Sequence, residues 1–254
     1  MDTKTRIAVI TGGSRGLGRS AALHLARRGV HSVVTYQSNQ KAADETVREL
    51  SALGVKAVAL QLDVARADTF DAFAKSLAAA LKKTWDRDRF DALVNNAGTG
   101  LHKVFAETSE AELDGLFGVH LKGPFLLTQR LLPLIADGGH ILNVSTGLAR
   151  FTVPGYSAYA AMKGAVEVLT RYLAKELAPR RISVNTIAPG AIATDFAGGA
   201  VRDNPQVQTM LASVTALGRV GQADDIGPVV SSLLMDENGW INGQRIEASG
   251  GMFL

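Results

Sequence analysis

Short apolar runs alternate with segments of helical pattern along almost the whole chain of 254 residues. Most of these runs are continuously apolar, whereas a strand with one face in water would alternate apolar and polar residues. Strands buried on both faces belong to a parallel sheet with helices on either side. The sequence therefore predicts an α/β protein. We predict seven strands, at Arg6–Thr11, Ser32–Tyr36, Lys56–Leu62, Asp91–Asn95, His140–Ser145, Ile182–Ile187 and Gln244–Glu247.

The segments between these strands carry apolar residues at helical spacing. One region, residues 193–216, is instead rich in Gly, Asp and Asn, and we predict an irregular, mobile flap over the substrate there. No repeat or linker divides the chain, so we expect one domain over residues 1–254. The predicted helices are Gly18–Arg28, Ala42–Leu53, Thr69–Lys82, Glu110–Ile135, interrupted near Gly123-Pro124, and Ser157–Ala178.

The composition excludes several classes of function. The formal charge is only +3, and basic and acidic residues are interspersed, which argues against a nucleic-acid surface. The absence of cysteine excludes disulfides, thiolate nucleophiles and cysteine metal sites, and the five histidines show no metal-ligand spacing. No apolar run reaches the ~18 residues of a membrane span, and the first residues lack the apolar stretch of a signal peptide. We expect a cytoplasmic protein with no metal, nucleic-acid or membrane partner.

A glycine-rich turn, Thr11-Gly12-Gly13-Ser14-Arg15-Gly16-Leu17-Gly18, joins the first predicted strand to the first helix. Glycines let the backbone approach a ligand closely, and the N–H groups that begin the helix attract an anion. A turn in this context predicts a bound dinucleotide. Its spacing is GxxxGxG, which differs from the commonest dinucleotide fingerprint, GxGxxG.

Tyr159 and Lys163 are four residues apart in a predicted helix, so their side chains share one face at the edge of its apolar stripe. A nearby ammonium, together with the positively charged ring of an oxidised dinucleotide cofactor, favours the phenolate, so we expect the phenol pKa to fall from ~10 and the phenol to act as an acid or base. Tyr156 has Ala160 at the same offset and lacks such a partner. The structural alternative is an ordinary buried tyrosine beside an exposed lysine.

The motifs of the chain together resemble those of the short-chain dehydrogenase/reductase family. These are TGGSRGLG, Leu62-Asp63-Val64, Asn95-Asn96-Ala97-Gly98, the Tyr159/Lys163 pair and Pro189-Gly190-Ala191-Ile192-Ala193-Thr194, in that order. The similarity covers essentially the whole chain and is greatest to 3-oxoacyl-carrier-protein reductase-like members. It implies a single doubly wound Rossmann-type domain that transfers hydride between a nicotinamide cofactor and a carbonyl or alcohol.

The resemblance also implies where the cofactor binds. Lys163 would hold the nicotinamide ribose, and Tyr159 would donate the proton. The other implied residues are Gly12, Ser14, Arg15, Gly16, Leu17 and Gly18 at the pyrophosphate and ribose, Asp63 and Val64 at the adenine, Asn95, Ala97 and Gly98 along the groove, and Pro189, Gly190, Ile192 and Thr194 in the segment near the nicotinamide.

The end of the second strand indicates which nicotinamide cofactor is used. A site for NAD places a carboxylate there to accept a hydrogen bond from the ribose 2′-hydroxyl. Here the segment reads Tyr36-Gln37-Ser38, with no acid to repel a 2′-phosphate, and Arg15 adds a positive charge. We therefore predict that NADP(H) is favoured over NAD(H), with Tyr36, Gln37 and Ser38 near the adenosine ribose.

Two positions depart from the family pattern. The family's serine stands thirteen residues before its tyrosine, and that count reaches Thr146, although Ser145 is adjacent and stays an alternative. Either hydroxyl can donate to a substrate carbonyl. The family usually has asparagine where His120 stands. Histidine there either sustains a proton relay, with titration near neutral pH, or packs as a helix residue.

These observations predict an NADPH-dependent reductase of a ketone or aldehyde. The alternatives are a non-catalytic NADP-binding regulator or scaffold, which the two departures would suit, and a purely structural subunit. By resemblance we expect a homo-oligomer, a dimer or tetramer, paired through the helices around Glu110–Ile135 and Ser157–Ala178. The substrate stays open, but a partly apolar pocket is predicted from Phe151, Val153, Tyr156 and Phe196.

Overall fold

The computed structural model describes residues 5–254, and its centre is a seven-stranded sheet with the strand order β3-β2-β1-β4-β5-β6-β7. Every neighbouring pair of strands is parallel. The order reverses between β1 and β4, so this is a doubly wound Rossmann-type sheet, as predicted. The strands are β1 (Ile7–Ile10), β2 (His31–Tyr36), β3 (Ala57–Gln61), β4 (Phe90–Asn95), β5 (Ile135–Val144), β6 (Ser183–Pro189) and β7 (Arg245–Ala248).

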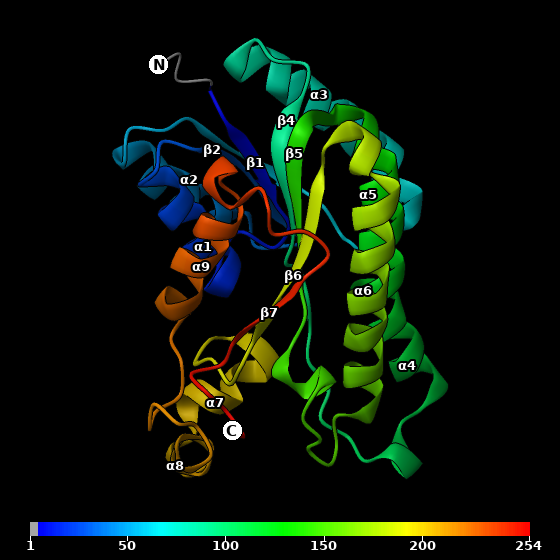
Figure 1. Ribbon diagram of the computed structural model, residues 1–254, viewed down its shortest axis with the longest axis vertical. Helices are drawn as coiled ribbons and strands as arrows, with labels where there is room; N and C mark the ends of the chain where they lie inside the picture. The colour runs from blue at the N-terminus through cyan, green and yellow to red at the C-terminus, as the bar shows by residue number, and fades with distance from the viewer. Residues whose placement is uncertain (1–4) are drawn as a thin grey trace.

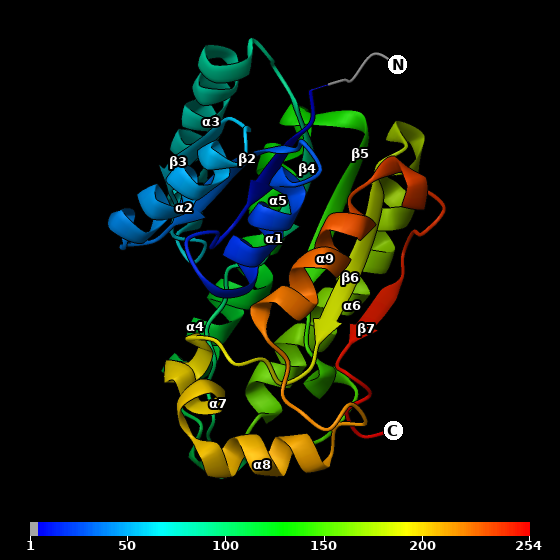
Figure 2. The same cartoon turned by 90° about the vertical axis from the view of Figure 1, so that its left-hand side faces the viewer.

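Helices cover both faces of the sheet (Figures 1 and 2). Successive residues of β1 point to opposite sides: Val9 packs into one buried apolar cluster and Ile10 into the other. This explains why the strand sequences are continuously apolar. One face carries α1 (Gly16–Ala26), α2 (Gln40–Ala52) and α9 (Ala223–Leu233), and the other carries α3 (Phe70–Trp85), α5 (Gly123–Leu131) and α6 (Ser157–Glu176).

The long helix predicted over Glu110–Ile135 is broken into several elements. Helix α4 (Glu110–Phe117) continues through a π-helical turn, Gly118–Lys122, into α5. Pro124 has no N–H to donate to the carbonyl four residues earlier, which is where the wider turn lies. The prediction was wrong at its end, because Ile135 already belongs to β5.

Two other regions differ from the sequence prediction. Helix α9 was not predicted, and Gly227-Pro228 in its middle resembles a turn signal. Residues 193–216 are largely helical rather than irregular, since they contain α7 (Ala200–Asp203) and α8 (Pro205–Ser213). The Asn204 side chain caps α8, which then begins with proline.

The carboxyl ends of the parallel strands meet at one edge of the sheet, where α7, α8 and the C-terminus also lie (Figures 1 and 2). The glycine turn follows β1, the motif beginning at Asn95 follows β4, and Ser145 and Thr146 follow β5. Ligands of such sheets bind at this edge, where the strand order reverses. Within residues 5–254, no helix is long and apolar enough to cross a bilayer, and no group of three or more His, Asp or Glu side chains is placed to hold a metal ion.

Candidate active site

The glycine turn after β1 is packed closely against α1, and at Gly18 this packing leaves no room for a side chain. Gly12 has a φ of +64°, in the left-handed region that favours glycine. A Cβ atom on Gly18 would lie 2.4 Å from the Gly12 carbonyl oxygen and 2.6 Å from the Asn96 Nδ2. The sequence therefore requires glycine at position 18, because the first turn of α1 lies directly against the strand end.

Hydrogen bonds from the end of β4 fix this turn. The Thr11 hydroxyl donates to the Val94 carbonyl at 3.2 Å and accepts from the backbone N–H groups of Asn96 and Ala97, both at 2.9 Å. The Asn96 Nδ2 donates to the carbonyls of Thr11 at 2.8 Å and Gly12 at 3.1 Å. Asn96 was not among the predicted site residues, although its place in the motif Asn95-Asn96-Ala97-Gly98 was a signal for it.

The N-terminus of α1 fits an anionic group. Its N-cap residue, Arg15, makes no side-chain capping bond, and the first turn holds no acidic residue. The first N–H groups of the helix therefore have no side-chain partner, and their partial positive charge favours a phosphate. The side chain of Thr46 on α2 donates to the Ser14 carbonyl at 3.3 Å and so joins the glycine turn to α2.

The segment after β6, which includes Thr194, lies next to the N-terminus of α1. The Cβ of Thr194 is 3.8 Å from the position a Cβ would take on Gly16. Ile192 pairs with Gly221 in an isolated parallel bridge, and the Gly190 N–H donates to the Ala248 carbonyl at 3.2 Å. A groove of about 590 Å³ lies between the helix and this segment. It is lined by Gly16, Arg19, Ser20, Ala193, Thr194, Asp195, Arg202, Gln222, Ala223 and Asp224, of which only Gly16 and Thr194 were predicted site residues.

The ends of β2 and β3 are joined next to the predicted adenosine site. Gln37 Nε2 donates to the Asp63 carboxylate at 3.0 Å, and the same carboxylate accepts from the Ala65 N–H at 2.9 Å. The Leu62 N–H donates to the Tyr36 carbonyl at 2.9 Å. Tyr36, Gln37 and Asp63 therefore lie together, as the prediction of an adenosine site requires.

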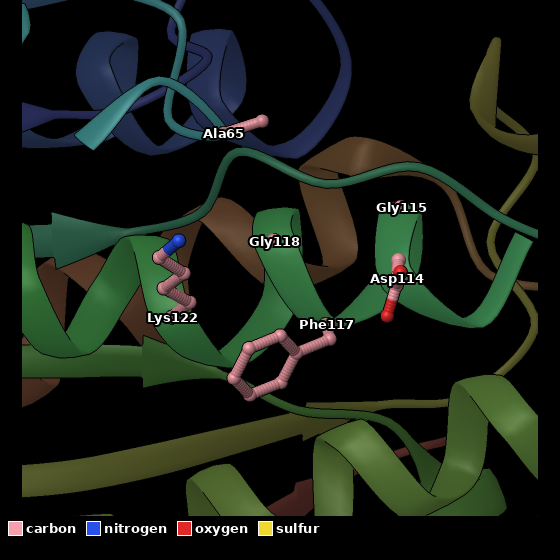
Figure 3. Close-up of a pocket in the computed structure, with 6 residues that line it drawn as sticks. All are labelled: Ala65, Asp114, Gly115, Phe117, Gly118 and Lys122. Atoms are coloured by element: carbon pink, nitrogen blue, oxygen red, sulfur yellow. The ribbon is translucent and has the colours of Figure 1, made fainter. Parts of the chain in front are cut away.

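A hollow of about 380 Å³ opens beside this point, between the loop after β3 and helix α4 (Figure 3). Asp114 and Lys122 lie on either side of Gly118 along the helix, and Ala65 lies across from them (Figure 3). The lining residues are Ala65, Asp114, Gly115, Phe117, Gly118 and Lys122. None of them was predicted from the sequence, and only the neighbouring Asp63-Val64 pointed to this region.

Asn95 lies deeper than the sequence prediction placed it. Its Nδ2 donates to the Asn143 Oδ1 at 2.8 Å and to the Thr128 hydroxyl at 3.0 Å. The Asn143 Nδ2 in turn donates to the Thr170 hydroxyl on α6 at 2.9 Å. The Asn95 side chain is therefore part of a buried polar network that joins β4 to β5, α5 and α6.

The structure distinguishes the two hydroxyls that follow β5. The side chain of Thr146 lies next to the phenol of Tyr159 and favours its ionised form. The Ser145 hydroxyl is directed elsewhere and donates to the carboxylate of Glu167 at 2.6 Å. The count of thirteen residues thus led to the hydroxyl that lies beside Tyr159.

Burial sets the protonation states of Tyr159 and Lys163. Burial raises the pKa of the Tyr159 phenol, and the neighbouring Thr146 side chain opposes this only in part. In the protein alone the phenol therefore keeps its proton, whereas the lowered pKa was expected with the positive ring of the oxidised cofactor beside it and stays a prediction. Burial also lowers the pKa of the Lys163 ammonium to about 8. Lys163 Nζ donates to the Val144 carbonyl at 2.6 Å and lies 5.9 Å from the centre of the Tyr159 ring.

His120 lies in the π-helical turn and packs against the ring of Tyr159. Its ring meets that of Tyr159 edge to face, with centroids 5.2 Å apart, and its Nε2 lies 2.7 Å from the Thr99 carbonyl. Burial, together with the charge of Lys163, lowers its pKa to about 3, so the prediction of titration near neutral pH was wrong. Its Nδ1 is buried with no partner among the described residues. A part in a proton relay stays a prediction.

Three aromatic pairs involve residues predicted for the apolar pocket, and one of these pairs includes Tyr159. The ring of Phe196, from the flap, lies 5.9 Å from the Tyr159 ring, and Tyr156 lies 4.8 Å from His102. The rings of Phe151 and Phe253 are 5.5 Å apart. Three of the four residues predicted for an apolar pocket thus contribute aromatic rings, while His102 and Phe253 were missed because they lie far away in the sequence.

A helix N-terminus that fits a phosphate and a buried tyrosine–lysine pair, on one edge of a doubly wound sheet, define a nicotinamide-dependent oxidoreductase of the short-chain type. The chain belongs to the short-chain dehydrogenase/reductase family, since a family model described as enoyl-(acyl carrier protein) reductase matches residues 12–253. It is therefore an enzyme of the oxidoreductase class.

Individual relatives agree with this assignment. The chain is 37% identical to 3-oxoacyl-[acyl-carrier-protein] reductase of Staphylococcus aureus over 252 residues, which cover 98% of this chain and 99% of that protein. A promiscuous reductase that catalyses keto-reduction at C1 in lugdunomycin biosynthesis has a similar structure, with a TM-score of 0.92, 41% identity and coverage of 97% and 96%. The structure of an angucycline C-6 ketoreductase with bound NADP is also similar, with a TM-score of 0.93 and 33% identity. The match covers 98% of this chain and 95% of that protein.

The packing at Gly18 predicts that Gly18→Ala weakens cofactor binding. The new methyl group must displace the Gly12 carbonyl or Asn96, which distorts the glycine turn. We expect the Kd for NADPH, measured by fluorescence titration, to rise at least tenfold, which corresponds to ~1.4 kcal/mol. Gly164→Ala on α6, where a Cβ meets nothing within 4 Å, is the matched control. Equal Kd values for the two variants would contradict the assignment.

Proposed function

We propose that this chain reduces a ketone or aldehyde with NADPH, and that Tyr159 is the proton donor. The observation that carries the proposal is the buried phenol of Tyr159, which lies next to Thr146 and one helical turn from the buried amine of Lys163. A buried phenol that keeps its proton suits the reductive direction, in which the enzyme must supply a proton to oxygen.

The reduced nicotinamide, when bound, supplies the hydride. The hydroxyls of Thr146 and Tyr159 donate hydrogen bonds to the substrate oxygen and stabilise the negative charge that develops there. Tyr159 then transfers its proton to that oxygen, so the carbonyl gains one hydride at carbon and one proton at oxygen. The ammonium of Lys163 stabilises the phenolate that remains, and the same amine would hold the ribose of the cofactor.

The cofactor is proposed to be NADP(H). This is supported by the glycine turn, by Arg15 and by the absence of an acid at the end of β2. Among the described hydrogen bonds, the only carboxylate beside Gln37 is that of Asp63, which follows the next strand. The related angucycline ketoreductase was solved with NADP bound. The Asp63 carboxylate already accepts from Gln37 and from the Ala65 N–H, which limits its capacity to bind a ribose hydroxyl.

The substrate is proposed to be a carbonyl compound with an apolar or aromatic body. The ring of Phe196 beside Tyr159 supports this chemistry, as do the ring pairs Tyr156–His102 and Phe151–Phe253. Aromatic faces bind flat apolar groups through large contact areas. Two of the related proteins are named for keto-reduction in the lugdunomycin and angucycline series.

We further propose that two or more copies of the chain associate through α4, α5 and α6. Large apolar side chains are exposed on these helices and the loop before them, including Phe105 at 84% and Tyr172 at 64% exposure. Exposed apolar surface of this extent marks an interaction site. The others are Val104, Leu113, Phe117, Phe125 and Val168. A monomeric mass in solution would contradict this assembly.

Replacing the proton donor tests the central proposal. We expect Tyr159→Phe to lower kcat for carbonyl reduction by 10² to 10⁴, the usual contribution of general acid catalysis, while NADPH still binds. The measurement is NADPH consumption over a panel of ketones and aldehydes, with cofactor binding followed by fluorescence. Tyr172→Phe, which removes an exposed phenol from the same helix, is the control. Undiminished turnover in Tyr159→Phe would refute the mechanism.

The cofactor preference is tested with the wild-type protein. We expect KM for NADPH to lie at least tenfold below KM for NADH, because the 2′-phosphate meets a positive charge and no carboxylate at the end of β2. Initial rates at saturating carbonyl substrate give both constants. Equal values would remove the argument from Arg15 and Gln37.

The lowered pKa of Lys163 predicts a pH dependence. The amine is charged below a pH of about 8 and loses its proton above it, so the support for a phenolate is lost as the pH rises. We expect kcat/KM for reduction, which reports the free enzyme, to fall as the pH rises through about 8. In Lys163→Arg the charge persists, so the fall should disappear from the profile. A wild-type profile that is flat up to pH 10 would contradict this role.

A further inference from the structure

Arg245 on β7 contacts the turn that carries Thr146, although the two residues are 99 positions apart. Its Nη2 donates to the Thr146 carbonyl oxygen at 3.2 Å. Its Nε donates to the Glu167 carboxylate at 2.7 Å, and its Nη1 donates to the Glu247 carboxylate at 2.5 Å. One guanidinium therefore joins the end of β5, helix α6 and strand β7.

Glu167 connects this guanidinium to the helix that carries the catalytic pair. It follows Lys163 by four residues and Tyr159 by eight, so all three side chains lie on one face of α6. The Glu167 oxygen that accepts from Arg245 also accepts from the Ser145 hydroxyl at 2.6 Å. Ser145 and Thr146 are thus both held, one through its side chain and the other through its carbonyl.

The cluster is sheltered from water, which makes its hydrogen bonds directional and strong. The side chain of Arg245 is 21% exposed and that of Glu167 is 14% exposed. Although burial opposes the charge, the two carboxylates raise the pKa of Arg245 above its usual value. A fixed, charged fork with three acceptors restricts the position of the main chain at Thr146.

We propose that Arg245 and Glu167 are positioning residues, which hold the Thr146 hydroxyl in place against Tyr159 and the substrate oxygen. This inference rests on the proposed function, in which Thr146 donates to that oxygen. Neither side chain hydrogen-bonds Tyr159 among the described contacts: Arg245 donates to the Thr146 carbonyl, and Glu167 acts through Arg245 and through the adjacent Ser145. Their effect arises because displacement of a catalytic group by about 1 Å can cost on the order of 10² in rate.

A double-mutant cycle tests whether Arg245 acts through Thr146. We expect Arg245→Met to lower kcat by about tenfold or more while the Kd for NADPH stays unchanged. In the Thr146→Val background the same change should cost less than twofold, because the hydroxyl that Arg245 positions is already absent. Arg245→Lys, which keeps the charge but not the fork, should recover part of the rate. For the slowest variants, the rate constant of the chemical step is measured in single-turnover experiments.

Arg180 provides the matched control. It is 28% exposed and also donates to a carboxylate, of Asp137, and to main-chain carbonyls, of Leu132 and Ile135, but at the far end of the sheet. Arg180→Met should lower the unfolding midpoint and leave kcat unchanged. Glu167→Gln is a second variant in case Arg245→Met does not fold, since the amide oxygen still accepts from Ser145. Its loss of kcat should likewise vanish in the Thr146→Val background.

Equal losses of kcat in the presence and absence of the Thr146 hydroxyl would overturn the proposal, because they would show a general structural role. Unchanged kcat in Arg245→Met or Glu167→Gln would overturn it too. These outcomes differ from failure of the proposed function. That failure would appear first, as a wild-type protein that reduces no carbonyl or a Tyr159→Phe variant that keeps full turnover, and the inference would fall with it.

Discussion

The active edge of this protein depends on the attachment of helix α6 to the carboxyl end of strand β5. Four side chains on one face of the helix make this contact, each to a different point of the strand end. Lys163 donates to the Val144 carbonyl, and the buried amine is thereby held without a carboxylate partner. Loss of this register would separate the hydroxyl, the phenol and the amine at once. The contacts run from Tyr159 to Thr146, from Lys163 to Val144, from Glu167 to Ser145 and from Thr170 to Asn143.

The same burial sets the chemistry of the site. Removal from water disfavours charge, so it raises the pKa of the Tyr159 phenol and lowers those of Lys163 and His120. A protonated phenol and a lowered amine pKa follow from this burial, while burial together with the charge of Lys163 keeps the imidazole neutral. In the protein alone, desolvation is the largest effect on the pKa of Tyr159. The burial of these groups therefore decides their ionisation more than their spacing does.

Much of the fold could be predicted from the sequence, because the signals are local. Largely apolar runs correspond to the strands before β7, and their burial explains the parallel sheet, whereas β7 itself reads Arg245-Ile246-Glu247-Ala248. Prediction failed where local and tertiary preferences conflict. Pro228 resembles a breaker, yet it lies within α9, which packs against α1. The glycines before α7 made the whole segment resemble a loop. A cap at Asn204 and proline at the next position nevertheless begin helix α8.

The sequence by itself determined the order of strands and helices, the glycine turn before α1 and the shared helix face of Tyr159 and Lys163. These follow from periodicity and from spacings of a few residues, which a chain carries in any environment. Only the tertiary structure decided that Thr146 rather than Ser145 meets Tyr159, that the Asn95 side chain turns into the core, and that Asn96 holds the glycine turn. The physical reason is that adjacent side chains leave a strand end in different directions, so their partners are fixed by the packing of elements that lie far apart in the chain.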